Sequence, residues 1–77
     1  MKRINESAQV ITENRRPKIV IWGKRRFTVT RVVDFWIRQS RWWGKEEKRV
    51  YLLLNTDHGL IEVYRRDETW ILSRLFD

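Results

Sequence analysis

Hydrophobic and polar residues alternate along much of the chain, which is the pattern of half-buried β-strands. The clearest case is the segment 26–37, whose odd positions carry five apolar residues: Phe27, Val29, Val33, Phe35 and Ile37. Arg31 interrupts the alternation, and a β-bulge near 31–33 would explain the flaw and curve the sheet. Because β-branched residues are frequent in this segment, the pattern indicates a strand and not a helix.

The same pattern predicts six strands in the order of the chain. They cover residues 8–12, 18–22, 26–37, 48–55, 60–66 and 70–76. Turn-forming residues separate them at 13–17, 22–25, 56–59 and 66–68, and residues 39–47 read as a polar loop. We therefore expect an all-β fold: one small antiparallel meander of five or six strands, curled into a barrel-like or strongly bent sheet. Residues 1–7 are expected to form a flexible N-terminus before a single β domain over 8–77.

Length and composition favour a binding module over an enzyme. A chain of 77 residues buries only about 60% of its unfolded surface, which leaves little volume for a deep substrate pocket. It has no cysteine and one histidine, His58, which lies in a predicted turn. We therefore expect no catalytic residue, no metal and no cofactor. A pocket converging on His58 or Asp34 would revive the enzyme hypothesis.

Positive charge is concentrated in the first part of the sequence. The net charge is +7, and residues 1–49 hold 14 Lys and Arg against 5 Asp and Glu. Most of these cations surround the first predicted hairpin: Arg15, Arg16, Lys18, Lys24, Arg25, Arg26 and Arg31. Antiparallel pairing would join them into one basic strip that binds phosphates. The alternative is an edge hairpin that carries charge to prevent aggregation.

Aromatic residues supply a second candidate surface. Arg41, Trp42 and Trp43 lie in the predicted loop, where an exposed tryptophan would stack on a base or anchor a protein contact. The alternative is that both tryptophans fold back over the open end of the sheet. Tyr51 and Tyr64 lie opposite the aliphatic faces of their strands, so both faces are partly apolar and one of them is either covered or a docking patch.

No run of about 18 apolar residues is present, and residues 1–10 lack the apolar centre of a signal peptide. We therefore expect a cytoplasmic protein with no membrane contact. The sequence predicts no oligomeric state.

An ordered set of short motifs spans about residues 8–77. It comprises Pro17, Val20-x-Trp22, Arg25-Arg26-Phe27-Thr28-Val29, Arg41-Trp42-Trp43, Arg49-x-Tyr51, Thr56-Asp57-x-Gly59, Glu62-Val63-Tyr64-Arg65, Trp70-x-Leu72 and Leu75-Phe76-Asp77. This set resembles a small, uncharacterised bacterial domain family that is similar to the C-terminal region of ImuB-type proteins, the Y-family polymerase-like proteins of translesion synthesis. The chain departs from the family pattern in the position of its hairpin glycine and at Val20 and Val50. The resemblance implies an accessory role in DNA damage tolerance, and no catalytic residue carries over.

The sequence therefore predicts a non-enzymatic module that binds nucleic acid through the basic hairpin and the tryptophan loop; the partner is DNA or RNA, and DNA is the one we expect. One alternative is a protein-interaction module that docks on a repair polymerase-like or RecA-like partner; its contact residues would be Trp43, Tyr51, Tyr64 and Arg65. A further alternative is a structural domain that forms homodimers through its apolar second face.

Overall fold

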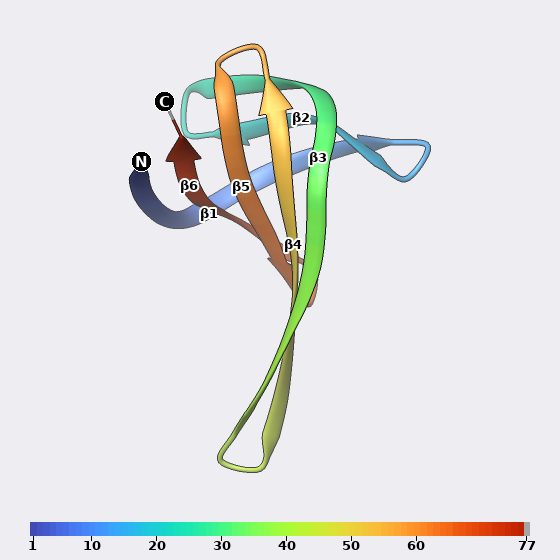
Figure 1. Ribbon diagram of the computed structural model, residues 1–77, viewed down its shortest axis with the longest axis vertical. Coiled ribbons are helices and arrows are strands. Elements are labelled where there is room, and N and C mark those ends of the chain that lie inside the picture. The colour runs from blue at the N-terminus through green and yellow to red at the C-terminus, as the bar shows by residue number, and fades with distance from the viewer. Residues whose placement is uncertain (77) are drawn as a thin grey trace.

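Six antiparallel strands form one ring-like sheet. The computed structural model describes residues 1–76, apart from the side chain of Trp42. The strands are β1 (Lys2–Glu13), β2 (Arg16–Trp22), β3 (Arg25–Trp42), β4 (Lys45–Thr56), β5 (Gly59–Arg66) and β6 (Thr69–Phe76). Each strand pairs with the next along the chain, and β1 also pairs with β6, which closes the ring (Figure 1). The predicted all-β meander is confirmed, and the described residues form no helix, so none that could cross a membrane.

The core lies inside the ring and draws on five of the six strands. Its buried side chains lie on the inward face of these strands. On β5 they alternate, as the period of a strand requires, and on β6 a register shift sets them three residues apart. The buried side chains are Val20, Phe27, Leu54, Ile61, Val63, Leu72 and Leu75. Ile4 on β1 and Trp70 on β6 pack against this cluster and are only partly buried. Apolar burial is therefore the main source of stability in a chain without disulfides.

Two β-bulges in β3 account for the flaw in its alternation. The register with β4 shifts between Val29 and Arg31 and again between Val32 and Asp34. Each shift adds one residue to β3, so the inward-facing set passes from odd to even positions and back. The predicted bulge near 31–33 is confirmed. The strand bends sharply in this region, which lets it leave β2 and continue along β4 (Figure 1).

The prediction of a polar loop over residues 39–47 is wrong, because these residues continue β3 and β4 into a long hairpin. Arg41 lies opposite Glu46, and the pair forms an ion pair at 3.0 Å between Nη2 and Oε1. Trp43 and Gly44 form the turn with positive φ angles of 50° and 79°. We call residues 39–48 the extended hairpin, since β3 and β4 pair there only with each other. Polar residues on both faces had concealed the strand pattern.

The expected flexible terminus over residues 1–7 also differs from the structure. Residues 2–7 belong to β1 and face β6, with Arg3 opposite Arg74 and Ser7 opposite Ile71. The register slips between Arg3 and Glu6, where Asn5 has a φ of +52°. A polar sequence can still form a strand when a neighbouring strand supplies the backbone partners.

Candidate functional site

A basic groove opens where β3 leaves β2. The tight β1–β2 turn has positive φ at Asn14 and Arg15, as in a type I′ turn, and it holds Arg15 at its tip. The groove encloses about 570 Å³ between this hairpin and the bend of β3. Its cations are Arg15, Arg16, Lys18 and Arg31, and its apolar lining is Pro17, Val29, Val32 and Leu52. We call this site the basic groove; no carboxylate is among its lining residues.

The single basic strip expected from the sequence is divided in two. Lys24, Arg25 and Arg26 lie at the β2–β3 turn, at the opposite end of β2 from the basic groove. Since β2 has seven residues, the two groups lie roughly 20 Å apart along the strand. The Arg25 guanidinium lies over Phe27 at 5.0 Å and over Trp22 at 5.8 Å from the ring centroids. Within residues 1–76, none of the seven cations that surround the first hairpin predicted from the sequence forms an ion pair.

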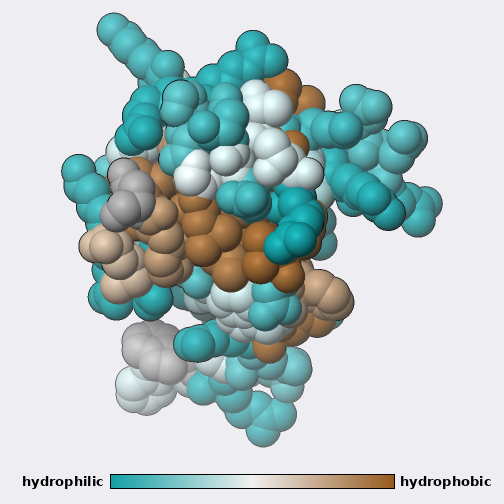
Figure 2. Space-filling model, turned by 45° about the horizontal axis from the view of Figure 1, so that its top comes forward, coloured by the Kyte–Doolittle hydropathy of each residue, from teal (hydrophilic) through white to brown (hydrophobic). Residues whose placement is uncertain are grey.

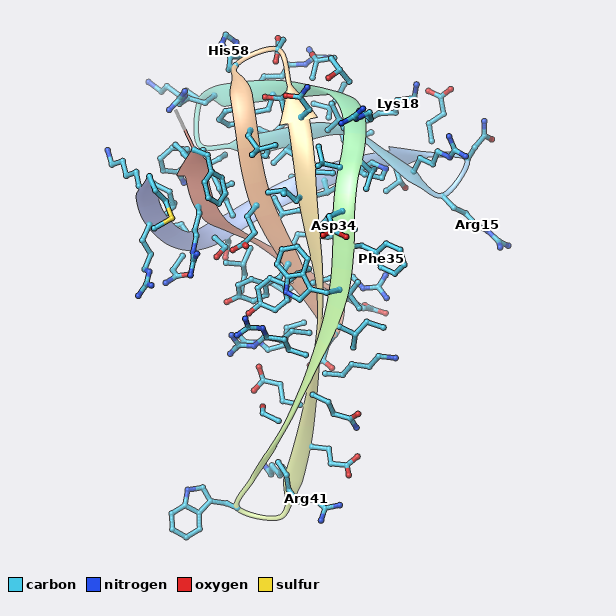
Figure 3. The ribbon with its side chains drawn as sticks, viewed as in Figure 1. Arg15, Lys18, Asp34, Phe35, Arg41 and His58 are labelled. Atoms are coloured by element: carbon cyan, nitrogen blue, oxygen red, sulfur yellow. The ribbon has the colours of Figure 1, made fainter. Side chains whose placement is uncertain are left out.

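The tryptophan loop of the sequence prediction lies at a third place, the tip of the extended hairpin. The Trp43 side chain is 86% exposed, so it does not fold back over the ring. The Trp42 side chain lies outside the described residues. Figure 3 shows Arg41 near this tip, remote from both Arg15 and His58. The three groups of predicted binding residues therefore lie at three separate places in the fold.

An apolar strip runs along β3 and β4 beside the free edge of β3. Pairing places Phe35 opposite Leu52 and Ile37 opposite Val50, so these four side chains share one face. Phe35 is 64% exposed and Ile37 52% exposed, because β2 has already ended its pairing with β3 at Thr28. Figure 2 shows hydrophobic residues gathered in a band with hydrophilic residues on either side. We call these four residues the apolar strip.

The other face of the same strands carries an aromatic ladder that sequence reasoning did not find. Trp36, Tyr51 and Tyr64 are direct cross-strand neighbours on β3, β4 and β5. The Trp36 and Tyr51 rings are parallel, with centroids 5.4 Å apart, and the Tyr51 and Tyr64 rings lie 5.0 Å apart. Such stacking stabilises neighbouring strands. The sequence did carry a signal for this ladder at the even positions of β3, but the more regular apolar residues at its odd positions obscured it.

Arginines cover this ladder and surround a pocket of about 340 Å³. The Arg38 guanidinium lies 5.6 Å from the Tyr51 ring centroid, and that of Arg49 lies 4.9 Å from the Tyr64 ring centroid. Arg3 on β1 and Arg74 on β6 complete the basic lining, and Glu62 is its one carboxylate. We call this site the arginine–tyrosine pocket. It shares no residue with the basic groove.

Two carboxylates orient arginines at this pocket. Arg49 Nε donates a hydrogen bond to Glu47 Oε1 at 2.5 Å, and this bond, followed by an interaction with Tyr51, raises the pKa of Arg49 above its ordinary value. Glu62 is buried, with its Oε2 3.6 Å from Arg74 Nε. These two carboxylates therefore hold both arginines in place at the pocket.

The predicted protein-contact residues differ in their accessibility. Tyr64 is only 7% exposed beneath Arg49, and Tyr51 is half-buried in the ladder. Arg65 is exposed, with its guanidinium 5.9 Å from the Trp70 ring centroid. Trp43 is therefore the most accessible member of the set.

The candidate catalytic side chains lie apart from each other. His58 is exposed at the β4–β5 turn, 3.7 Å from Asp57 and edge-on to the Phe27 ring. The Asp34 carboxylate accepts a hydrogen bond from the backbone N–H of Phe35. Neither residue lines the basic groove or the arginine–tyrosine pocket. Among the described residues, no three His, Cys, Asp or Glu side chains are grouped so that they could hold a metal ion.

The geometry thus offers three binding surfaces: the basic groove, the apolar strip, which shares Leu52 with this groove, and the arginine–tyrosine pocket. No family model, curated protein or solved structure matches this chain.

Proposed function

We propose that the chain is a non-enzymatic module that binds nucleic acid, with DNA as the expected partner, through the basic groove. The observation that carries this proposal is the gathering of Arg15, Arg16, Lys18 and Arg31 around one opening without a carboxylate among its lining residues. Unpaired surface cations attract phosphates, and they release condensed counterions when they bind.

The shape of the groove favours an extended strand over a compact anion. Three arginines supply planar donors that match phosphate oxygens, and Lys18 adds a point charge. Val29, Val32 and Leu52 add apolar side chains to the lining of the groove, which suits sugar and base contacts between the phosphates. A strand of nucleic acid offers both phosphates for the cations and apolar surface for these three residues.

The resemblance to the C-terminal region of ImuB-type proteins supplies a biological setting for this proposal. It suggests an accessory role in DNA damage tolerance, in which the module holds DNA beside a polymerase-like protein. This role depends on the resemblance and on DNA binding together, so the binding test comes first.

Fluorescence anisotropy with a short single strand and with its duplex tests the proposal. The variant Arg15→Gln/Lys18→Gln/Arg31→Gln removes three cations of the basic groove. Each phosphate contact contributes about 0.7 to the slope of log K against log salt for a single strand. We expect the variant to lower that slope by about 2 and to weaken binding most at low salt.

The matched control is Lys2→Gln/Lys45→Gln/Lys48→Gln, which removes the same charge from exposed positions outside the basic groove. We expect it to bind almost as the unmodified chain does. Equal loss of affinity in the two variants would mean that net charge alone drives binding, and the proposal would then be wrong.

A second candidate function is protein docking along the free edge of β3. The apolar strip lies beside that edge, with Phe35 and Ile37 more than half exposed, and Trp43 projects from the tip beyond it. Exposed aromatic residues and unpaired strand edges are common features of protein interfaces. The partner is either a second copy of the chain or a repair protein.

Light scattering at two protein concentrations separates these partners. A mass that rises with concentration, and that falls to the monomer in Phe35→Ser/Ile37→Ser, indicates a homodimer. A monomer at both concentrations excludes self-association and leaves this surface to a different protein.

A further inference from the structure

We propose that the arginine–tyrosine pocket binds a phosphate monoester group. This inference does not depend on nucleic-acid binding by the basic groove, because the two sites share no residue.

Charge is the first argument. Four arginines line the pocket against one carboxylate, that of Glu62, and the neighbouring Glu47 offsets one further positive charge through Arg49. The pocket thus keeps a net charge of +2. A phosphate monoester carries about −1.5 to −2 at neutral pH, which matches this excess.

Preorganisation is the second argument. The guanidiniums of Arg38 and Arg49 lie over tyrosine rings, Glu47 orients Arg49, and Glu62 orients Arg74. Arginines that are already held lose less conformational freedom when they bind an anion. The aromatic ladder therefore serves as the support on which the donors are fixed.

Hydroxyl donors are the third argument. Tyr64 and Ser73 are buried residues that line the pocket. Within residues 1–76, every buried side-chain nitrogen or oxygen that is sealed from solvent has a hydrogen-bond partner. No hydrogen bond between described residues engages either hydroxyl, so both open onto the pocket and can donate to phosphate oxygens.

Backbone irregularity is the fourth argument. The β1–β6 register slips beside Asn5, whose φ is +52°, and the β5–β6 register slips between Glu62 and Val63. Asn5, Glu62 and Ser73 all line the pocket. Bulges of this kind are frequent beside binding sites, where they redirect side chains.

The volume limits what accompanies the phosphate. About 340 Å³ is near the lower end of small-molecule sites, so the pocket accommodates a mononucleotide or the terminal nucleotide of a strand. Both carry a phosphate monoester, and the experiment distinguishes them.

Isothermal titration calorimetry with adenosine 5′-monophosphate and with adenosine tests the proposal, and the Trp36 indole N–H signal in NMR localises the contact. We expect the nucleotide to bind, the nucleoside not to bind, and the affinity to fall as the pH drops through about 6, where the monoester takes up its second proton. Equal binding of nucleotide and nucleoside would overturn the proposal.

The variant Arg3→Gln/Arg38→Gln removes two pocket arginines that form no ion pair within residues 1–76. We expect its dissociation constant for the nucleotide to rise about tenfold or more, because the phosphate loses charged hydrogen bonds from two arginines. The control Arg25→Gln/Lys45→Gln removes the same charge elsewhere and is expected to bind normally. An equal loss in the control overturns the proposal.

Oligonucleotides with and without a 5′-phosphate identify the source of the monoester. Binding that the terminal phosphate tightens, and that Arg3→Gln/Arg38→Gln weakens, assigns the pocket to strand ends. Binding of the free nucleotide with no effect of the terminal phosphate assigns it to a small phosphorylated ligand. If the basic-groove variant loses oligonucleotide binding but retains the nucleotide, both proposals stand and the two sites act independently. If the unmodified chain binds the nucleotide while the basic-groove variant and its control bind oligonucleotides equally, this inference stands and the proposed function fails.

Discussion

At the scale of the residue, two small sets of side chains hold the ring together. Leu72 and Leu54 are fully buried in the core. Asp57, at the β4–β5 turn, accepts a hydrogen bond from Thr28 N–H at 2.8 Å through Oδ1 and donates its own N–H to the Thr28 carbonyl at 3.0 Å. This reciprocal pair ties the turn to β3 just before β3 bends. Core packing and one turn contact therefore position the residues that form the basic groove.

Leu72→Ala should lower the free energy of unfolding by about 2–5 kcal/mol, because it leaves a cavity in a small core. Ile37→Ala removes the side chain of a half-exposed aliphatic residue and should cost less than about 1 kcal/mol. Urea unfolding of both variants measures the difference. Similar losses would mean that the apolar strip is covered in solution.

Asp57→Ala should destabilise the fold by about 1–2 kcal/mol, since it removes the acceptor for the Thr28 N–H. Asp57→Asn retains a side-chain carbonyl acceptor and should recover part of this loss. Thermal unfolding of the two variants provides the comparison, and identical midpoints for the two would refute the role of the side chain.

At the scale of the element, β3 is the strand that contributes residues to the basic groove, the apolar strip and the arginine–tyrosine pocket. Its first part pairs with β2 and contributes Phe27 to the core, and its bend lines the basic groove through Val29 and Arg31. Its second part presents Phe35 and Ile37 on one face and Trp36 and Arg38 on the other. Because successive side chains of a strand point to opposite faces, the apolar strip and the arginine–tyrosine pocket lie on opposite faces of β3.

Gly44→Ala should loosen the extended hairpin without unfolding the ring. Gly44 has a φ of +79°, where a side chain costs about 1–2 kcal/mol. We expect amide hydrogen exchange over 39–48 to accelerate roughly tenfold, while β5 and β6 amides are unchanged. Lys45→Ala is the control, and acceleration throughout the sheet would show that the hairpin is coupled to global stability.

The sequence predicts strands well where one face is apolar and poorly where neither face is. The segments 60–66 and 70–76 agree with β5 and β6 to within one residue. Residues 39–47 and 2–7 carry polar side chains on both faces, so periodicity gave no signal there and cross-strand partners decided the outcome. The basic groove was predicted in part, since Arg15, Arg16, Lys18 and Arg31 do converge. The arginine–tyrosine pocket depends on a register between strands that no local pattern reveals.

At the scale of the whole molecule, residues from the two ends of the sequence lie side by side on the surface. The first part of the chain is basic and the last part is not, yet β1 pairs with β6. This pairing brings Arg3 beside Arg74 and contributes both to one pocket. Ring closure therefore redistributes the charge that the sequence segregates.

Removal of residues 1–7 should open the ring. The truncation deletes most of the β1–β6 pairing and the contact of Ile4 with the core, so we expect a loss of roughly 2–4 kcal/mol. It also exposes the edge of β6, which favours association at higher concentration. Urea unfolding and light scattering measure both effects, with removal of Met1 alone as the control. An unchanged midpoint would mean that residues 2–7 contribute nothing to the closed sheet.

The paired bulges of β3 have a consequence for chain length. Thr30 and Val33 are the extra residues, and the strand returns to ordinary alternation after each of them. A strand that lost Val33 would still direct Phe35 and Trp36 to their present faces, because β4 already pairs with the residues on either side. Natural relatives of this protein should therefore vary by single-residue deletions at these two positions, with both binding faces of the hairpin kept intact and only the bend of the strand relaxed.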